Sequence, residues 1–223
     1  MSAPDEGGGY DENACIDLEG VLIPELWPQI AQASGIEALS ITMREEPDYP
    51  ALMRWRIDHL RKNGLRLRDV QAMIAKTQTY PDAVVFLQQL TQQRGYRVHI
   101  VSDCFYELAG TLLDALGSPE SFCHSLETDA DGWITGCAWA DRNGKEEHIS
   151  RLLEQGCHVL AAGDAFNDLV MLRLAHNGFL VRPSQATMTA AQDLTVVEHL
   201  HEIIEAISAV EPSSDKCISR YGP

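Results

Sequence analysis

Three short apolar runs along the chain each end at a polar cluster. The runs span residues 14–16, 97–101 and 158–162. Each run is short, partly β-branched and followed by a loop, which is typical of a buried strand in a parallel sheet. The pattern therefore predicts three strands whose polar ends lie far apart in the sequence.

Helical patterns separate these predicted strands. Apolar residues recur at spacings of three and four in residues 82–93, 106–116 and 145–156, which is the period of an amphipathic helix. The third run is followed by a helix over 168–176, an apolar stretch over 178–181, a helix after Pro183 and a last helix from Val197 to about Ala209. This alternation predicts an α/β fold in which helices cover both faces of a parallel sheet.

Two segments interrupt the alternation. Between Pro24 and Pro81 there is no strand signal, and helical periodicity marks residues 26–33, 51–63 and 68–77. A helical insertion is therefore expected directly after the first strand. Within residues 122–139, the sequence Asp129-Ala130-Asp131-Gly132 separates two β-like stretches and predicts a small hairpin.

One core with one insertion is the natural arrangement for a chain of 223 residues. We expect the core to comprise residues 13–23 and 81–210, and the helical insertion to comprise residues 24–80. The polar ends of the chain predict flexible tails over residues 1–12 and 211–223.

The composition, with 45% hydrophobic and 22% charged residues, is that of an ordinary globular protein. The chain has 17 Lys and Arg residues and 33 Asp and Glu residues, which gives a formal net charge of −16. Such a field repels nucleic acid and anionic membranes, so neither is an expected partner. A small anionic substrate would meet the same repulsion unless a local cation or metal ion overrides it.

The six cysteines show no C-x-x-C pair and no zinc-site spacing, so free thiols are expected. The first residues lack the basic and apolar regions of a signal peptide. No apolar run approaches the roughly 18 residues that a membrane span needs. These features predict a cytoplasmic protein without a membrane partner.

Four polar clusters are the candidate chemistry. They are Asp17-Leu18-Glu19-Gly20-Val21, Ser102-Asp103, Lys145 ahead of its helix, and Gly163-Asp164-Ala165-Phe166-Asn167-Asp168. Ligands of open α/β sheets bind beyond the carboxyl ends of the strands, where three of these clusters are expected to meet. Together they supply a carboxylate nucleophile, an acid/base, a hydroxyl, an ammonium and further acids for a hard cation, which phosphoryl transfer requires.

Each cluster alone has a simpler interpretation. The first acid pair could start a turn, and Ser102, Asp103, Asn167 or Asp168 could each cap a helix. Lys145 stands beside two glutamates and could lie on a solvated helix face. The order of the clusters, with three of them directly after predicted strands, favours the functional interpretation.

In this order the clusters resemble the four motifs of the haloacid dehalogenase superfamily of phosphatases. Within it, the chain is most similar to the phosphoserine phosphatase branch and its ThrH group, bifunctional phosphoserine phosphatases and homoserine phosphotransferases. The likeness lies in Ala14–Leu22, Pro47–Tyr49, Ser102–Glu107 and Ala161–Asp168. Most of the superfamily has Asp where this chain has Glu19, and the ThrH group shares the Glu. The resemblance implies a Rossmann-like core with a helical cap formed by the insertion.

The resemblance also implies catalytic roles. Asp17 would attack phosphorus and become an aspartyl phosphate, while Glu19 would protonate the leaving alcohol and then activate the acceptor. Mg²⁺ would be bound by the Asp17 carboxylate, the Glu19 carbonyl oxygen and Asp164, with Asp168 supporting it. This cation would also offset the repulsion between an acidic protein and an anionic substrate.

Substrate contacts follow from the same resemblance. Ser102 and Lys145 would bind the phosphoryl oxygens, and Asn167 would position groups around them. In the cap, Glu25 suits a substrate ammonium, and Arg56 suits a substrate carboxylate because a guanidinium binds carboxylates in bidentate fashion. Arg56 has two arginine neighbours on its predicted helix, however, and any of the three could face solvent.

These expectations lead to a Mg²⁺-dependent phosphatase that hydrolyses O-phospho-L-serine, and transfer of the phosphoryl group to homoserine remains open. One alternative is a phosphatase for another small phosphorylated metabolite. Another is a non-catalytic protein that binds a divalent cation, although the presence of both Asp17 and Glu19 speaks against it, because cation binding needs no acid/base. A homodimer is implied by the resemblance alone.

Overall fold

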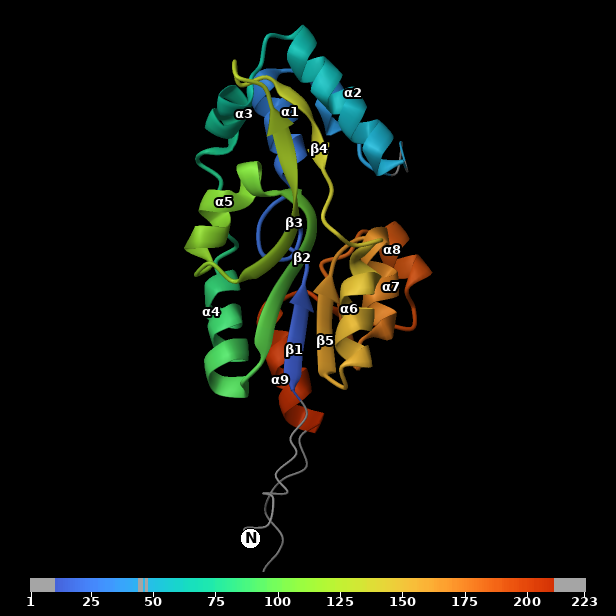
Figure 1. Cartoon of the computed structure of the whole chain (residues 1–223). Helices are drawn as coiled ribbons and strands as arrows, with labels where there is room; N and C mark the ends of the chain where they lie inside the picture. Colours follow the sequence, from blue (N-terminus) through green and yellow to red (C-terminus); the bar gives the residue numbers. More distant parts are fainter. Residues whose placement is uncertain (1–10, 44–45, 47, 211–223) are drawn as a thin grey trace, which may run out of the picture.

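A seven-stranded sheet forms the centre of the computed structural model, which describes residues 11–43, 46 and 48–210 (Figure 1). The strand order is β4-β3-β2-β1-β5-β6-β7, and the neighbours pair in parallel except for β3 and β4. The strands are β1 (Glu12–Ile16), β2 (Arg97–Phe105), β3 (Glu120–Thr128), β4 (Ile134–Ala138), β5 (His158–Gly163), β6 (Asn177–Val181) and β7 (Thr195–Val197).

Helices cover both faces of this sheet, which confirms the predicted α/β class (Figure 1). One face carries α4 (Ala83–Gln88), α5 (Tyr106–Ala115) and α9 (Leu200–Val210). The other face carries α6 (Lys145–Glu154) and α7 (Leu169–Leu174), with α8 (Gln185–Ala190) beside them.

Alternate residues of the central strands point into two separate apolar cores. Ala14 and Ile16 of β1 belong to the core beneath α4, α5 and α9, whereas Cys15 belongs to the core beneath α6 and α7. Because both faces are buried, each strand is a continuous apolar run rather than an alternation of apolar and polar residues.

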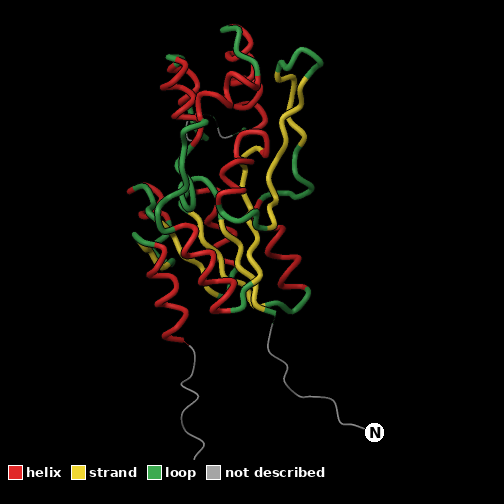
Figure 2. The backbone as a smooth tube through the Cα atoms, turned by 90° about the vertical axis from the view of Figure 1, so that its left-hand side faces the viewer, coloured by secondary structure: helices red, strands yellow, loops and turns green. Residues whose placement is uncertain are grey.

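The insertion forms a helical unit beyond the carboxyl ends of the strands (Figures 1 and 2). It contains α1 (Leu26–Ser34), a short 3-10 helix (Glu37–Ser40), α2 (Tyr49–Lys62) and α3 (Leu67–Ile74). The Asp48 carboxylate caps α2 by accepting a hydrogen bond from the Ala51 amide at 3.0 Å. The three predicted helices of this segment are therefore present.

The predicted hairpin, formed by β3 and β4, extends alongside the insertion (Figure 2). The carbonyl oxygen of Gly132 at its tip accepts a hydrogen bond from the Leu67 amide at 3.1 Å. The Arg66 guanidinium lies 4.9 Å from the ring centroid of Trp133, a cation–π contact. The insertion thus contacts the core through the hairpin as well as through its own chain connections.

Strand β2 is longer than its apolar run predicts. It continues to Phe105, and its register against β3 shifts between Val101 and Phe105. Ser102 and Asp103 therefore lie in the irregular end of the strand rather than in a loop after it. Such an irregularity re-aims side chains at the end of a strand.

Two predicted boundaries are wrong by a few residues. Glu12, which the composition assigned to the N-terminal tail, opens β1 because its backbone pairs with His158 and its carboxylate binds the His158 imidazole at 2.7 Å. Val197 ends β7, and the last helix begins at Leu200. A three-residue edge strand next to a helix carries too little periodicity to separate the two in the sequence.

Other predictions fall partly outside the described range. Residues 1–10 and 211–223 of the two predicted tails, Cys217, and Pro47 of the second matched segment lie outside the described residues. The five described cysteines are free thiols. Within the described range, no helix is both long and apolar enough to cross a membrane.

Candidate active site

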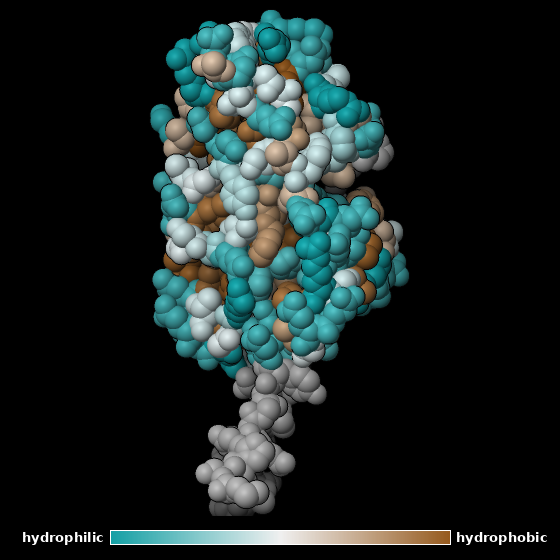
Figure 3. Space-filling view, viewed as in Figure 1, coloured by the Kyte–Doolittle hydropathy of each residue, from teal (hydrophilic) through white to brown (hydrophobic). Residues whose placement is uncertain are grey.

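A cavity of about 830 Å³ lies between the carboxyl ends of the central strands and the helical insertion. Eight of the nine residues put forward from the sequence line it: Asp17, Glu19, Glu25, Arg56, Ser102, Lys145, Asp164 and Asn167. The ninth, Asp168, is fully buried and binds Lys145. The outline of the molecule is indented on the right of Figure 3, between the insertion and the helices α6 to α8.

Asp17 follows the last residue of β1, where its amide still donates to the Ala162 carbonyl of β5 at 2.9 Å. Its side chain is 6% exposed. The Oδ1 atom accepts hydrogen bonds from the Leu18 amide and the Lys145 ammonium, both at 2.8 Å. Burial raises the pKa of Asp17 to about 7, although the Lys145 charge acts in the opposite direction.

Lys145 is the first residue of α6 and is 2% exposed, so the alternative interpretation, a lysine on a solvated helix face, is wrong. Its ammonium lies 2.8 Å from Asp17 and 2.7 Å from Asp168. Burial would lower the pKa of Lys145, but the charges of these carboxylates outweigh it and raise the pKa well above the ordinary value. Lys145 therefore stays charged inside the protein.

Asp164 and Asp168 complete an acidic cluster with Asp17. One oxygen from each carboxylate falls within a group whose members lie within 4.8 Å of one another. The Oδ2 atom of Asp168 accepts from the backbone amides of Asp164 and Ala165, both at 3.0 Å, which fixes the loop after β5. Burial and the neighbouring acids raise the pKa of Asp164 to about 8. Three close hard oxygen donors that repel one another suit Mg²⁺.

Gly20 allows the chain to pass close to this cluster. Its φ is +77°, a left-handed conformation that side chains disfavour. A Cβ atom at Gly20 would lie 2.3 Å from Oδ2 of Asp164. Glycine is therefore needed here both for the turn and for the space that Asp164 occupies.

Glu19, on the same turn, also lines the cavity. Oε1 accepts a hydrogen bond from the Leu26 amide, in the first turn of α1, at 2.7 Å. Burial, followed by the charge of Glu25, raises the pKa of Glu19 to about 8. A carboxyl group that holds its proton near neutral pH can act as a general acid.

The irregular end of β2 brings Ser102 and Asp103 to the cavity. Ser102 is 2% exposed, and Asp103 Oδ2 accepts from the side-chain amide of Asn167 at 3.0 Å. The helix that follows, α5, receives no side-chain cap, so the alternative role of these residues as helix caps is wrong. Arg142, which the sequence analysis missed, binds both the Ser102 carbonyl and Asp103 Oδ1 at 2.8 Å.

The three arginines of α2 differ in their exposure to solvent. Arg54 and Arg61 are exposed, whereas Arg56 is 5% exposed and lines the cavity. The Arg56 guanidinium lies 4.4 Å from the ring centroid of Trp27 and donates to the Ile41 carbonyl at 2.7 Å. Its buried Nε has no hydrogen-bond partner among the described residues.

Tyr49 lines the cavity, although the sequence assigned no role to it. It is the first residue of α2, and its hydroxyl donates to the backbone carbonyl of Asp103 at 2.6 Å. Its ring packs near Phe105 and Trp139. Helix α2 therefore contacts the strand that carries Ser102 directly.

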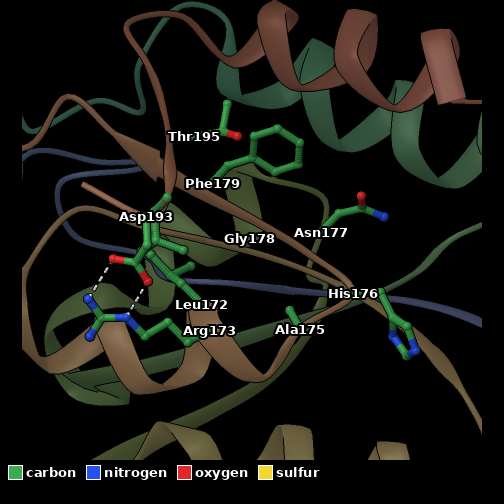
Figure 4. Close-up of a pocket in the computed structure, with 10 residues that line it drawn as sticks. Leu172, Arg173, Ala175, His176, Asn177, Gly178, Phe179, Asp193 and Thr195 are labelled. Atoms are coloured by element: carbon green, nitrogen blue, oxygen red, sulfur yellow. Dashed lines mark hydrogen bonds and ion pairs between the residues drawn. The ribbon is translucent and has the colours of Figure 1, made fainter. Parts of the chain in front are cut away.

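A second, smaller depression of about 320 Å³ lies at the opposite ends of the strands, where β6 and β7 begin (Figure 4). Arg173 and Asp193 face each other there and form a two-bond ion pair at 2.7 and 2.8 Å. None of the nine candidate site residues lines this depression. The candidate chemistry is therefore confined to the larger cavity.

Known proteins share much of this chain's sequence. A family model described as haloacid dehalogenase-like hydrolase matches residues 13–176. The phosphoserine phosphatase ThrH of Pseudomonas aeruginosa is 40% identical over 169 residues, covering 76% of this chain and 82% of that protein. A phosphoserine phosphatase of Pseudomonas syringae pv. tomato is 38% identical over 169 residues, covering 76% of this chain and 70% of that protein.

Solved structures share the fold. A phosphoserine phosphatase that holds an analogue of the phospho-aspartyl intermediate superposes with a TM-score of 0.73 at 21% identity, over 89% of this chain and 99% of that one. The phosphoserine phosphatase of T. onnurineus superposes with a TM-score of 0.69 at 24% identity, over 89% and 94%.

Proposed function

Because the chain belongs to the haloacid dehalogenase-like hydrolases, we propose that it hydrolyses O-phospho-L-serine through a covalent acyl phosphate on Asp17. The observation that carries this proposal is the position of Asp17, buried on the cavity floor with Lys145 at 2.8 Å and Asp164 and Asp168 beside it. The names of two relatives at 38 and 40% identity supply the substrate class.

The first half-reaction uses the two acids of the β1 turn. The hydrogen bonds that Asp17 accepts fall on Oδ1, so Oδ2 is the atom that attacks phosphorus. An Oδ2–P bond forms while the bond between phosphorus and the serine oxygen breaks. Glu19 gives its proton to that oxygen, and serine leaves as the neutral alcohol.

The second half-reaction reverses these roles. Water attacks the phosphorus atom, Glu19 takes up the water proton, and the bond between Asp17 Oδ2 and phosphorus breaks to release inorganic phosphate. If the hydroxyl of homoserine takes the place of water, the same steps yield phosphohomoserine. Hydrolysis and transfer therefore share one intermediate and differ in the acceptor.

The acidic cluster fits a divalent cation. Asp17, Asp164 and Asp168 offer hard oxygen donors, and we propose that Mg²⁺ is held there with the help of the Glu19 carbonyl oxygen. When bound, the ion would neutralise negative charge that accumulates on the phosphoryl oxygens. Ser102 and Lys145 would contact the same oxygens from the protein side.

The insertion provides the groups for the amino-acid part of the substrate. Arg56 is buried at the cavity wall with an unpartnered Nε, which supports its role as the partner of the substrate carboxylate. Glu25, which also lines the cavity, would bind the substrate ammonium. Residues 24–80 would then act as a cap that excludes water from the site.

The test is phosphate release from a panel of phosphorylated amino acids and sugars, with Mg²⁺ or with EDTA, and with homoserine as an added acceptor. We expect Mg²⁺-dependent turnover of phosphoserine and an acid-stable phosphorylated protein. Asp17→Asn should abolish both, whereas Asp193→Asn, at the distant ion pair, should leave both unchanged. Full turnover by the Asp17→Asn protein would overturn the mechanism, and selectivity for another phosphorylated compound would overturn the substrate.

A further inference from the structure

Asp103 connects three segments of the site through its side chain. Oδ2 accepts from the amide nitrogen Nδ2 of Asn167 at 3.0 Å, in the loop after β5. Oδ1 accepts from the Arg142 guanidinium at 2.8 Å, in the loop before α6, and lies 3.4 Å from Nε2 of His124 on β3. The catalytic scheme proposed above assigns no role to this carboxylate.

The hydrogen-bond donors around Asp103 keep its carboxylate ionised, so that it only accepts hydrogen bonds. Nδ1 of His124 accepts a hydrogen bond from the Ala140 amide at 2.9 Å, so the ring carries its proton on Nε2, which faces Asp103. The Arg142 side chain is 4% exposed and carries a permanent charge. Burial opposes ionisation of Asp103, but His124, Lys145 and Arg142 outweigh it and hold its pKa well below the usual range.

An ionised carboxylate determines which way the Asn167 amide faces. With Nδ2 towards Asp103, the amide donates to a charged acceptor. A flipped amide would place Oδ1 against Oδ2 of Asp103, an acceptor against an acceptor, with no proton between them. Asn167 lines the cavity, so this choice also decides which amide atoms face a bound phosphoryl group.

We propose that Asp103 is a positioning residue that fixes the side-chain amide of Asn167 for the phosphoryl group. The inference rests on the proposed phosphatase function and extends it to a residue that does not touch the reacting atoms. The rival interpretation is that Asp103 and Arg142 form a structural ion pair with no bearing on Asn167.

A double-mutant cycle separates the two interpretations. Asp103→Asn keeps the shape of the side chain but can donate as well as accept, so Asn167 loses its single orientation. We expect kcat/KM to fall by about tenfold, the effect of one charge-assisted hydrogen bond. In the Asn167→Ala background the same substitution should change kcat/KM by less than about twofold.

Asp193→Asn removes the acid of another Asp–Arg pair, far from the cavity, and should leave kcat/KM unchanged. Equal effects of Asp103→Asn with and without Asn167 would overturn the proposal. If Asp103→Asn does not fold, Asp103→Ser, which is smaller and also removes the carboxylate, enters the same cycle.

A second readout keeps this test independent of the proposed substrate. Binding of inorganic phosphate, measured by titration calorimetry in the presence of Mg²⁺, requires no turnover. The Asp103 and Asn167 substitutions should weaken it non-additively, as they do for kcat/KM. Failure of phosphoserine turnover with intact, coupled phosphate binding would reject the substrate assignment alone, whereas additive weakening of phosphate binding would reject the role of Asp103.

Discussion

Replacing Lys145 by methionine should lower the free energy of unfolding by about 3–5 kcal/mol, because it removes one partner from a buried cluster of charges. Methionine keeps most of the apolar stem but lacks the ammonium that lies 2.8 Å from Asp17 and 2.7 Å from Asp168. Asp17 and Asp168 are buried, at 4% and 0% exposure, so their carboxylates lose a cation that solvent replaces only in part.

Two opposing effects determine the size of this loss in unfolding free energy: two hydrogen bonds are lost, and the freed carboxyl groups can be protonated. A hydrogen bond between charged groups contributes about 1.5–3 kcal/mol, so the loss of two sets an upper range of about 3–6 kcal/mol. Part of this loss is recovered because the carboxyl groups can take up protons: the pKa of Asp17 already reaches about 7 with Lys145 present. The expected net loss therefore lies below the sum of the two bonds.

The assay is urea unfolding followed by circular dichroism at pH 7.5, with EDTA in one series and Mg²⁺ in another. Lys62→Met is the matched control, because its ion pair with Asp58 is exposed on both sides and should leave the unfolding free energy nearly unchanged. Mg²⁺ should restore part of the stability of the Lys145→Met protein by binding the acids of the folded state. A loss as small as that of Lys62→Met would refute the reasoning.

Two further predictions concern the Gly20 turn and a buried histidine. Gly20→Ala and Gly35→Ala both place a side chain at positive φ, which costs about 1–2 kcal/mol. At Gly20 the new Cβ would also lie 2.3 Å from the Asp164 carboxylate. At Gly35 nothing lies within 4 Å of the new Cβ. Urea unfolding should therefore show the larger loss for Gly20→Ala, and equal losses would contradict the contact. Burial of His148, followed by the charge of the neighbouring His99, lowers the pKa of His148 from 6.5 to about 4. Between pH 4 and pH 6.5, His148 is therefore protonated in the unfolded chain and neutral in the folded chain. Stability should be full above pH 6.5 and should fall as the pH drops towards 4, by roughly 2 kcal/mol at pH 5; His148→Gln should flatten that slope, and an unchanged slope would exclude His148 as its source.

Much of the fold could be predicted because the central strands are buried on both faces, which produces a recognisable pattern of apolar residues in the sequence. Both faces of β1 and β5 are covered, so each appears as an apolar run that ends abruptly at polar residues. The carboxyl ends of parallel strands meet at one edge of the sheet, which places Asp17 and Asp164 together although they are far apart in sequence. Five of the eight candidates that line the cavity reach it for this reason: Asp17, Glu19, Ser102, Asp164 and Asn167.

The residues that the sequence could not reveal act through contacts between separate segments. Arg142 lies in a loop without periodicity, and its partners Ser102 and Asp103 are about 40 residues away. Tyr49 looks like an ordinary helix-start residue until α2 is placed over the end of β2. Arg56 differs from its arginine neighbours only in the direction that it faces, which depends on how α2 packs.

The charges that line the cavity explain why this particular chain is expected to need a divalent cation. The single ammonium that contacts the acidic cluster among the described residues, that of Lys145, is already shared between Asp17 and Asp168, with Asp164 close to both. Burial, together with the neighbouring acids, raises the pKa of Asp17 to about 7 and that of Asp164 to about 8, so the cluster disfavours further negative charge. A phosphoryl group adds such charge, in a protein whose formal net charge is −16. Lys145 alone therefore cannot attract the substrate, and we expect a divalent cation to be needed for phosphate binding as well as for the chemical step.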